Sequence, residues 1–213
     1  MRIIKTLVIA LALGSIMSNS QAQIKRDIRW NENEFNKANT AKDVAYLSEN
    51  EKSVICLCNL ARSNGKLFAS TYLKDYAEKN SLNSEYVQSL YNDLENVNNL
   101  PMLIPNEELS EAAANHASDI GKNGKIGHNS SDGKDLSSRF EKYFEKGNIF
   151  ENCSYGKSEP IEIVMQLLID ENVTNLGHRK SILSSQYSSV GVSIAEHILF
   201  DFNCVLDFYD SVL

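Results

Sequence analysis

His128 and His178 are the residues whose type and setting most readily suggest chemistry in this sequence. His128 precedes the turn-rich segment 129–133, and His178 follows Gly177 at the start of a predicted short helix, 177–185. Neutral imidazole is a common ligand of Zn²⁺, which it binds at about 2.0–2.1 Å. A loop histidine taken alone is more often solvated than ligating. The interpretation therefore depends on which groups accompany the two rings.

Two glutamates are candidates to accompany these histidines. Glu151 begins a predicted strand, and Glu171 falls in a predicted helix over 160–172. In that helix Glu171 shares a stripe with Val164 and Leu168 at i, i+4, i+7 spacing. A carboxylate at an inward position costs free energy unless it is paired or ligated. The spacing therefore predicts that Glu171 points inward, although at the last helical turn it could also reach water. The opposite, polar face of the helix carries Glu162, Gln166 and Asp170.

A third histidine, His116, lies on the inward stripe of a predicted helix over 107–121. Its neighbours on that stripe, among them Ala113 and Ala117, are small and apolar. We interpret His116 as a core histidine hydrogen-bonded to backbone rather than as a ligand.

The common local motifs of catalysis are missing from the sequence. It contains no His-Glu-x-x-His helix, no Gly-x-Ser-x-Gly elbow and no phosphate-binding glycine loop. A cysteine nucleophile is possible in principle. However, Cys56 and Cys58 are far from both histidines in sequence, and Cys153 is flanked by predicted strand residues.

The first residues have the features of a secretory signal peptide. Arg2 and Lys5 precede an apolar run that ends near Met17, and Ser20-Gln21-Ala22 offers small residues at the −3 and −1 positions of a cleavage site. The run is shorter than the roughly 20 apolar residues of a spanning helix. We therefore expect residues 1–22 to be removed, and the mature chain to be secreted or to remain in the periplasm or cell envelope, with no membrane span.

Composition limits the partners of the mature chain. Without Arg2 and Lys5, 19 of the 21 basic residues remain against 28 acidic residues, and no long basic run survives. A chain of this charge is a poor candidate for binding nucleic acid or an anionic membrane surface.

Four cysteines in an exported chain permit disulfides. Cys56 and Cys58 lie two residues apart on a predicted helix and point in different directions, so we do not expect them to pair together. Cys153 and Cys204 each fall in a predicted strand. A Cys153–Cys204 bridge is the favoured prediction, with four free thiols as the main alternative.

The order of the predicted elements indicates the fold class. Residues 23–47 are polar and predict an arm ahead of a single domain, 48–213, that begins with the capping box Ser48-Glu49-Asn50-Glu51. Helices predominate early and strands late, which is typical of an α+β fold with a small antiparallel sheet. Between the capped helix and the helix over 107–121, residues 66–100 predict two short helices, about 71–79 and 84–97. The remaining predicted elements are an extended segment at 100–105, a helical stretch at 135–146 and strands at 151–156, 189–195 and 199–208.

Five short motifs follow one another in the sequence: Val54–Arg62 and Leu109–Asp119 on predicted helices, then Gly127-His128, Glu151-Asn152 and Gly177-His178-Arg179-Lys180-Ser181-Ile182-Leu183. Taken in this order, they resemble the CAP superfamily of cysteine-rich secretory proteins, antigen 5 and pathogenesis-related proteins, in its shorter bacterial, SCP-like form, of which the first two motifs are similar to the first and second helices. The similarity covers residues 49–65 and 100–209. The segment 66–100 has no counterpart in the short bacterial form and stands out as a helical insertion.

The resemblance implies an α-β-α sandwich with a central cleft. In many members two histidines and two acidic residues meet in that cleft and can hold a divalent metal, often zinc. Carried over residue by residue, these groups are His128, Glu151, Glu171 and His178. We expect the two histidines to bind the metal weakly, and the two glutamates to orient them or to hold a bound water.

The function favoured at this stage is a secreted, non-enzymatic binding domain that engages a lipid, peptide or protein in or beside the cleft. The main alternative is a metal-dependent, peptidase-like hydrolase with Glu151 as the base. A second alternative is a structural surface protein in which the four residues only hold helix and sheet together.

Overall fold

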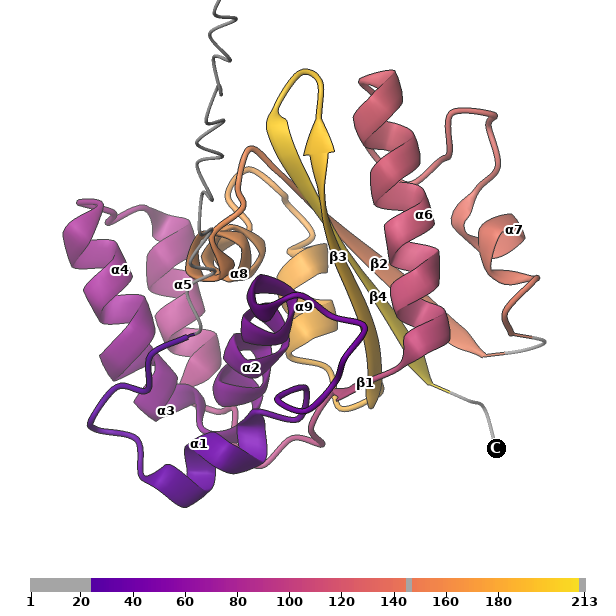
Figure 1. Ribbon diagram of the computed structural model, residues 1–213. Coiled ribbons are helices and arrows are strands. Elements are labelled where there is room, and N and C mark those ends of the chain that lie inside the picture. Colours follow the sequence, from indigo (N-terminus) through magenta and orange to yellow (C-terminus); the bar gives the residue numbers. More distant parts are fainter. Residues whose placement is uncertain (1–23, 145–146, 211–213) are drawn as a thin grey trace, which may run out of the picture.

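A four-stranded sheet lies between two layers of helices in the computed structural model, which describes residues 24–144 and 147–210 (Figure 1). The predicted signal peptide and its cleavage site lie outside the described residues. The α+β class is confirmed. The strands are β1 (Ile104–Pro105), β2 (Asn148–Tyr155), β3 (Ser189–His197) and β4 (Asp201–Asp210), in the spatial order β1-β3-β4-β2.

The sheet is mixed rather than purely antiparallel. β3 and β4 form the predicted hairpin, and β2 runs antiparallel to β4. The short β1 pairs with β3 in parallel, because the extended segment 100–105 enters beside the start of β3. The sequence predicted an antiparallel sheet and did not predict this parallel edge strand.

One face of the sheet is covered by α6 (Glu107–Asn123), with α7 (Leu136–Phe140) beside it (Figure 1). The side chain of Asn106 caps the start of α6 by accepting from Leu109 N, and Gly124 ends it at a φ of 61°. The helix lies close to β3, since a Cβ at Gly191 would stand 2.1 Å from the backbone of Leu109. Glycine at that position is what lets α6 approach the strand.

The other face is covered by α2 (Glu49–Ser63), α8 (Pro160–Ile169) and α9 (Gly177–Ile182) (Figure 1). The predicted capping box of Ser48 and Glu51 opens α2. Arg62, near the end of α2, is fully buried, and its guanidinium donates to four backbone carbonyls. These belong to Pro101, Ile182, Ser184 and Tyr187. Burial lowers the pKa of Arg62 to about 10.

A helical lobe lies outside this layer, and residues 24–47 are part of it. The prediction of a polar arm ahead of the domain is wrong, because Trp30, Ala38 and Ala41 are fully buried. The lobe consists of α1 (Glu32–Ala38), α3 (Gly65–Phe68), the π-helical turn η1 (Ala69–Leu73), α4 (Lys74–Lys79) and α5 (Glu85–Leu94). The segment that was predicted to be a helical insertion thus forms a continuous core with the chain's first described residues.

The predicted Cys153–Cys204 disulfide is wrong, and all four cysteines are free and buried. In the β2–β4 register Cys153 stands opposite Val205, and Cys204 stands opposite Ser154. Since successive side chains of a strand point to opposite faces, this one-residue offset places the two thiols on opposite sides of the sheet.

Within the described residues, every helix is too short or too polar to cross a membrane.

Candidate functional site

Glu151 on β2 is the centre of a buried polar cluster. Its side chain is inaccessible to solvent. Oε1 accepts a hydrogen bond from His128 Nδ1 at 2.9 Å, and Oε2 accepts one from Arg139 Nη2 at 2.7 Å. Arg139, which comes from α7, also donates to the carbonyl of His128. It thereby fixes both the carboxylate and the loop that bears the imidazole.

The charge of Glu151 is stabilised by these neighbours. Burial alone would raise the pKa of its carboxyl group, but the hydrogen bond from His128 and the charge of Arg139 outweigh burial and lower that pKa. Asp207, directly opposite on β4, accepts no hydrogen bond from a donor of the described residues. Its carboxyl group is fully buried, and burial together with the charge of Glu151 raises its pKa well above the usual value.

His116, from α6, and Cys153, from β2, complete the cluster. His116 is buried and donates from Nε2 to the carbonyl of Gly127 at 3.0 Å, which confirms the predicted burial and backbone hydrogen bond. The same Nε2 lies 3.6 Å from Glu151 Oε1. Cys153 Sγ is 3.7 Å from that oxygen and 3.9 Å from His128 Nδ1.

His178 is accompanied by Asp170, not by Glu171. Asp170 is buried and accepts from His178 Nδ1 at 2.7 Å and from the backbone amide of His178 at 3.0 Å, whereas Glu171 is exposed. The helix predicted to reach 172 ends at Ile169, and Asp170 takes the left-handed conformation at a φ of 55°. Because the helical phase stops there, the prediction that Glu171 points inward is wrong.

Arg179 holds the start of α9 in place behind His178. Its buried guanidinium donates to the carbonyls of Leu168 and Ile169 on α8, and it pairs with Asp93 on the helical lobe at 2.8 Å. Asn152, beside Glu151, donates to the carbonyl of His178. β2, α8, α9 and the lobe therefore jointly position His178.

His128 and His178 are not in direct contact through a hydrogen bond or an ion pair within the described residues. His128 is half-exposed. His178 borders a cavity of about 390 Å³, which Cys153, Tyr155 and Asp170 also line. Cys153 therefore belongs to the cluster around Glu151 and also lines the cavity beside His178.

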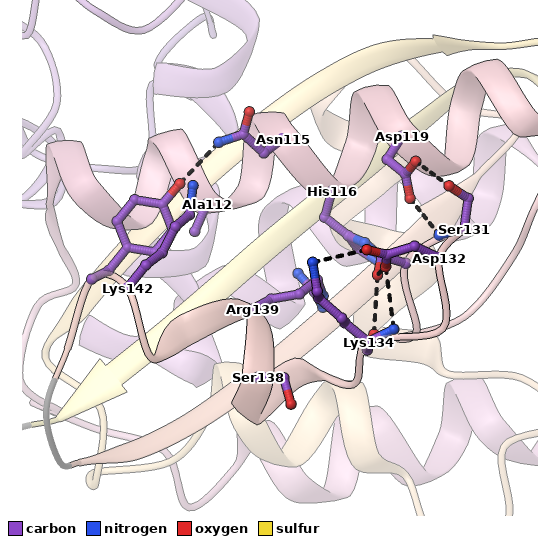
Figure 2. Close-up of a pocket in the computed structure, with 12 residues that line it drawn as sticks. Ala112, Asn115, His116, Asp119, Ser131, Asp132, Lys134, Ser138, Arg139 and Lys142 are labelled. Carbon is purple, nitrogen blue, oxygen red and sulfur yellow. Dashed lines mark hydrogen bonds and ion pairs between the residues drawn. The ribbon is translucent and has the colours of Figure 1, made fainter.

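A second cavity, of about 520 Å³, lies between α6, α7 and the loop that joins them (Figure 2). His116 and Arg139 border it, so it adjoins the cluster from the α6 side. Its rim is polar and carries both acidic and basic side chains. The rim residues include Asn115, Asp119, Ser131, Asp132, Lys134, Lys142 and Tyr143.

One group of side chains in residues 24–144 and 147–210 combines three potential metal ligands within 4.8 Å of one another. It consists of His116, Glu151 and Cys153, all buried. His128 and His178, the predicted ligand pair, are outside this group.

The fold and the site define the class of this domain as an α-β-α sandwich with histidines and carboxylates gathered at the edge of its sheet, and the family comparison agrees with that class. Residues 33–208 match the family model described as CAP, cysteine-rich secretory protein family. The chain belongs to this family.

Two solved structures are similar in fold. An outer surface protein from Borrelia burgdorferi shares 19% identity at a TM-score of 0.46, over 68% of this chain and 96% of that one. An extracellular protein containing a SCP domain from Bacillus anthracis str. Ames shares 24% identity at a TM-score of 0.44, over 58% of this chain and 40% of that one. A search of curated proteins gave no match.

Proposed function

We propose that the protein is an exported, non-enzymatic binding domain that holds a divalent cation through Nε2 of His128 and Nε2 of His178. A lipid, peptide or protein ligand would bind beside that cation. The observation that supports the proposal is the state of the two Nδ1 atoms. Each donates to a carboxylate, that of Glu151 for His128 and that of Asp170 for His178.

This arrangement fits a metal ligand of the imidazole type. A ring that donates from Nδ1 leaves the lone pair of Nε2 free, and a carboxylate behind the ring raises the basicity of that nitrogen. Asp170 takes the orienting role first assigned to Glu171. Zinc suits two neutral imidazoles, and two protein ligands leave positions for water or for a group of the bound molecule.

The state of Glu151 favours binding over hydrolysis. Both of its oxygens are engaged, and its lowered pKa makes it a poor general base near neutral pH. The hydrolase alternative needs this carboxylate to leave Arg139 and accept a proton. The structural alternative needs no ligand at all, and a binding measurement separates it from the proposal.

Export is part of the proposal and rests on the signal-like residues 1–22. An exported domain would meet its ligand outside the cytoplasm.

Calorimetric titration with Zn²⁺ of the chain from residue 23 onward tests the cation site. We expect His178→Ala to lower the affinity of one bound ion by at least about 100-fold, because it removes a ligand. Asp170→Asn should lower it by roughly 10- to 100-fold, the usual effect of losing an orienting carboxylate. Glu171→Ala is the matched control and should leave binding unchanged. Equal Zn²⁺ binding by the wild type and by His178→Ala would overturn the cation site.

A further inference from the structure

The group formed by His116, Glu151 and Cys153 has the chemistry and spacing of a metal site that does not involve His178. Glu151 Oε1 lies 3.6 Å from His116 Nε2 and 3.7 Å from Cys153 Sγ. The carbonyl oxygen of Gly127 lies 3.0 Å from the same imidazole nitrogen and 3.7 Å from the same sulfur. Four potential ligand atoms therefore surround one small volume.

Three of these four separations match those of a tetrahedral ligand set, and the distance between the Gly127 oxygen and His116 Nε2 is shorter because the two are hydrogen-bonded. Ligands at 2.0–2.3 Å from a zinc ion stand roughly 3.3–3.8 Å apart at the corners of a tetrahedron. A thiolate together with an imidazole selects zinc and similar divalent ions over calcium or magnesium, which prefer oxygen ligands. The ligand set thus defines the class of ion as well as the place.

We propose that His116, Glu151 and Cys153 form a buried binding site for Zn²⁺ or a similar divalent ion, distinct from the proposed pair of His128 and His178. The site goes beyond the proposed function, because each of its three ligands lies outside that histidine pair. Arg139 holds Oε2 of Glu151, and Oε1, which also accepts from His128 Nδ1, is the oxygen nearest to the other ligand atoms. The Gly127 carbonyl is placed to act as a fourth ligand.

Asp207 is an independent sign that a cation belongs here. Its carboxyl group is fully buried, no donor of the described residues reaches either of its oxygens, and the group with which it interacts is the carboxyl of Glu151, with which it can share only its own proton. It faces Glu151 across the β2–β4 pair. Two buried carboxyl groups that face each other repel when both are ionised, and a cation held by Glu151 and Cys153 would offset that repulsion.

The site can be reached from two sides. His116 borders the cavity between α6 and α7, and Cys153 borders the cavity beside His178. Binding releases the thiol proton to solvent, and the proton of His116 moves from Nε2 to Nδ1, so that sulfur and nitrogen each present a lone pair to the ion.

Co²⁺ is the probe for this site, because ligation by a thiolate gives a charge-transfer absorption in the near ultraviolet that oxygen and nitrogen ligands do not give. Titrating the metal-free chain from residue 23 onward with Co²⁺ should produce this band with one equivalent, and Zn²⁺ should abolish it. Cys153→Ser should remove the band, and His116→Asn should weaken Co²⁺ binding by at least about 10-fold.

Two control variants make the result specific. Cys204→Ala, on the opposite face of the sheet, should keep the band. His178→Ala should also keep it, so failure of the histidine-pair proposal and failure of this one are distinguishable. A wild-type chain that gives no thiolate band, or a band that persists in Cys153→Ser, would overturn the proposal. Circular dichroism of each variant verifies that it is folded.

Discussion

Three groups converge on one oxygen of Glu151, and this convergence decides the chemistry of the site. His128, His116 and Cys153 each place a polar atom within 2.9–3.7 Å of Oε1, while Arg139 occupies Oε2. An ionised carboxylate buried among donors is stabilised as an anion. It therefore serves better as an orienting group or a metal ligand than as a base that must collect a proton.

Asp207 should make the stability of the metal-free protein depend on pH. Its pKa in the folded state is raised above the unfolded value of about 3.9. A group of this kind contributes stability that is present below the unfolded pKa and is lost as pH rises through the folded pKa. Since an asparagine side chain cannot titrate, we expect Asp207→Asn to be more stable than the wild type at pH 7. This advantage should disappear as pH falls below the unfolded pKa.

Urea unfolding in the presence of a chelator, repeated from acidic to neutral pH, measures this difference. The groups that face Asp207 are Glu151 on β2 and Arg139 on α7, and both are unchanged in the variant. A constant difference between the two proteins across the pH range would contradict the raised pKa.

At the scale of elements, the sequence predicted most helices and strands but not where α8 ends. Apolar residues at helical spacing were sufficient to predict α2, α6 and α8. Alternation of apolar and polar residues was sufficient to predict β3 and β4. The end of α8 was not predicted because Asp170 continues the polar stripe of the helix and no glycine or proline comes directly after it. Asp can take the left-handed conformation that ends a helix, and its carboxylate then caps the next one.

The same limit explains the site residues that were missed. Glu151 was found from the family motif, but Arg139, Asp170 and Asp207 were not assigned. Their roles depend on which elements become neighbours, which no local spacing reports. Asp207 left one signal, a lone acidic residue within the apolar run 204–208 of a predicted strand.

The link between α8 and α9 should be sensitive to Asp170. Its carboxylate accepts from the ring and the amide of His178 and from the amide of Arg179. We expect Asp170→Ala to lower the free energy of unfolding by about 2–4 kcal/mol, because buried donors lose their acceptor and alanine disfavours the left-handed conformation. Glu171→Ala, one residue later and exposed, is the control and should be nearly neutral. Chemical denaturation of both variants measures the effect, and similar losses in the two would show that Asp170 has no special role.

At the scale of the whole molecule, the chain's first described residues and the segment 65–94 form one lobe against α2 and α8. Trp30 Nε1 donates to Thr71 Oγ1 at 3.1 Å, and the amide of Asp27 donates to the hydroxyl of Tyr72. Arg29 bonds to the carbonyl of Ser70. Arg179 then joins the lobe to the start of α9 through Asp93. The lobe is therefore connected to the element that bears His178.

This connection predicts that a destabilising substitution at Trp30 also loosens the backbone around His178. Trp30 is fully buried, so Trp30→Ala should cost about 3–5 kcal/mol of unfolding free energy through lost burial and a cavity. Ile28, two residues earlier, is 91% exposed, and Ile28→Ala should have no measurable effect. If the lobe supports α9, hydrogen exchange at the amides of His178 and Arg179 should accelerate in Trp30→Ala but not in Ile28→Ala. If the lobe does not support α9, the amides held by Asp170 open independently of the lobe. Faster exchange in Trp30→Ala would then be confined to residues 24–94.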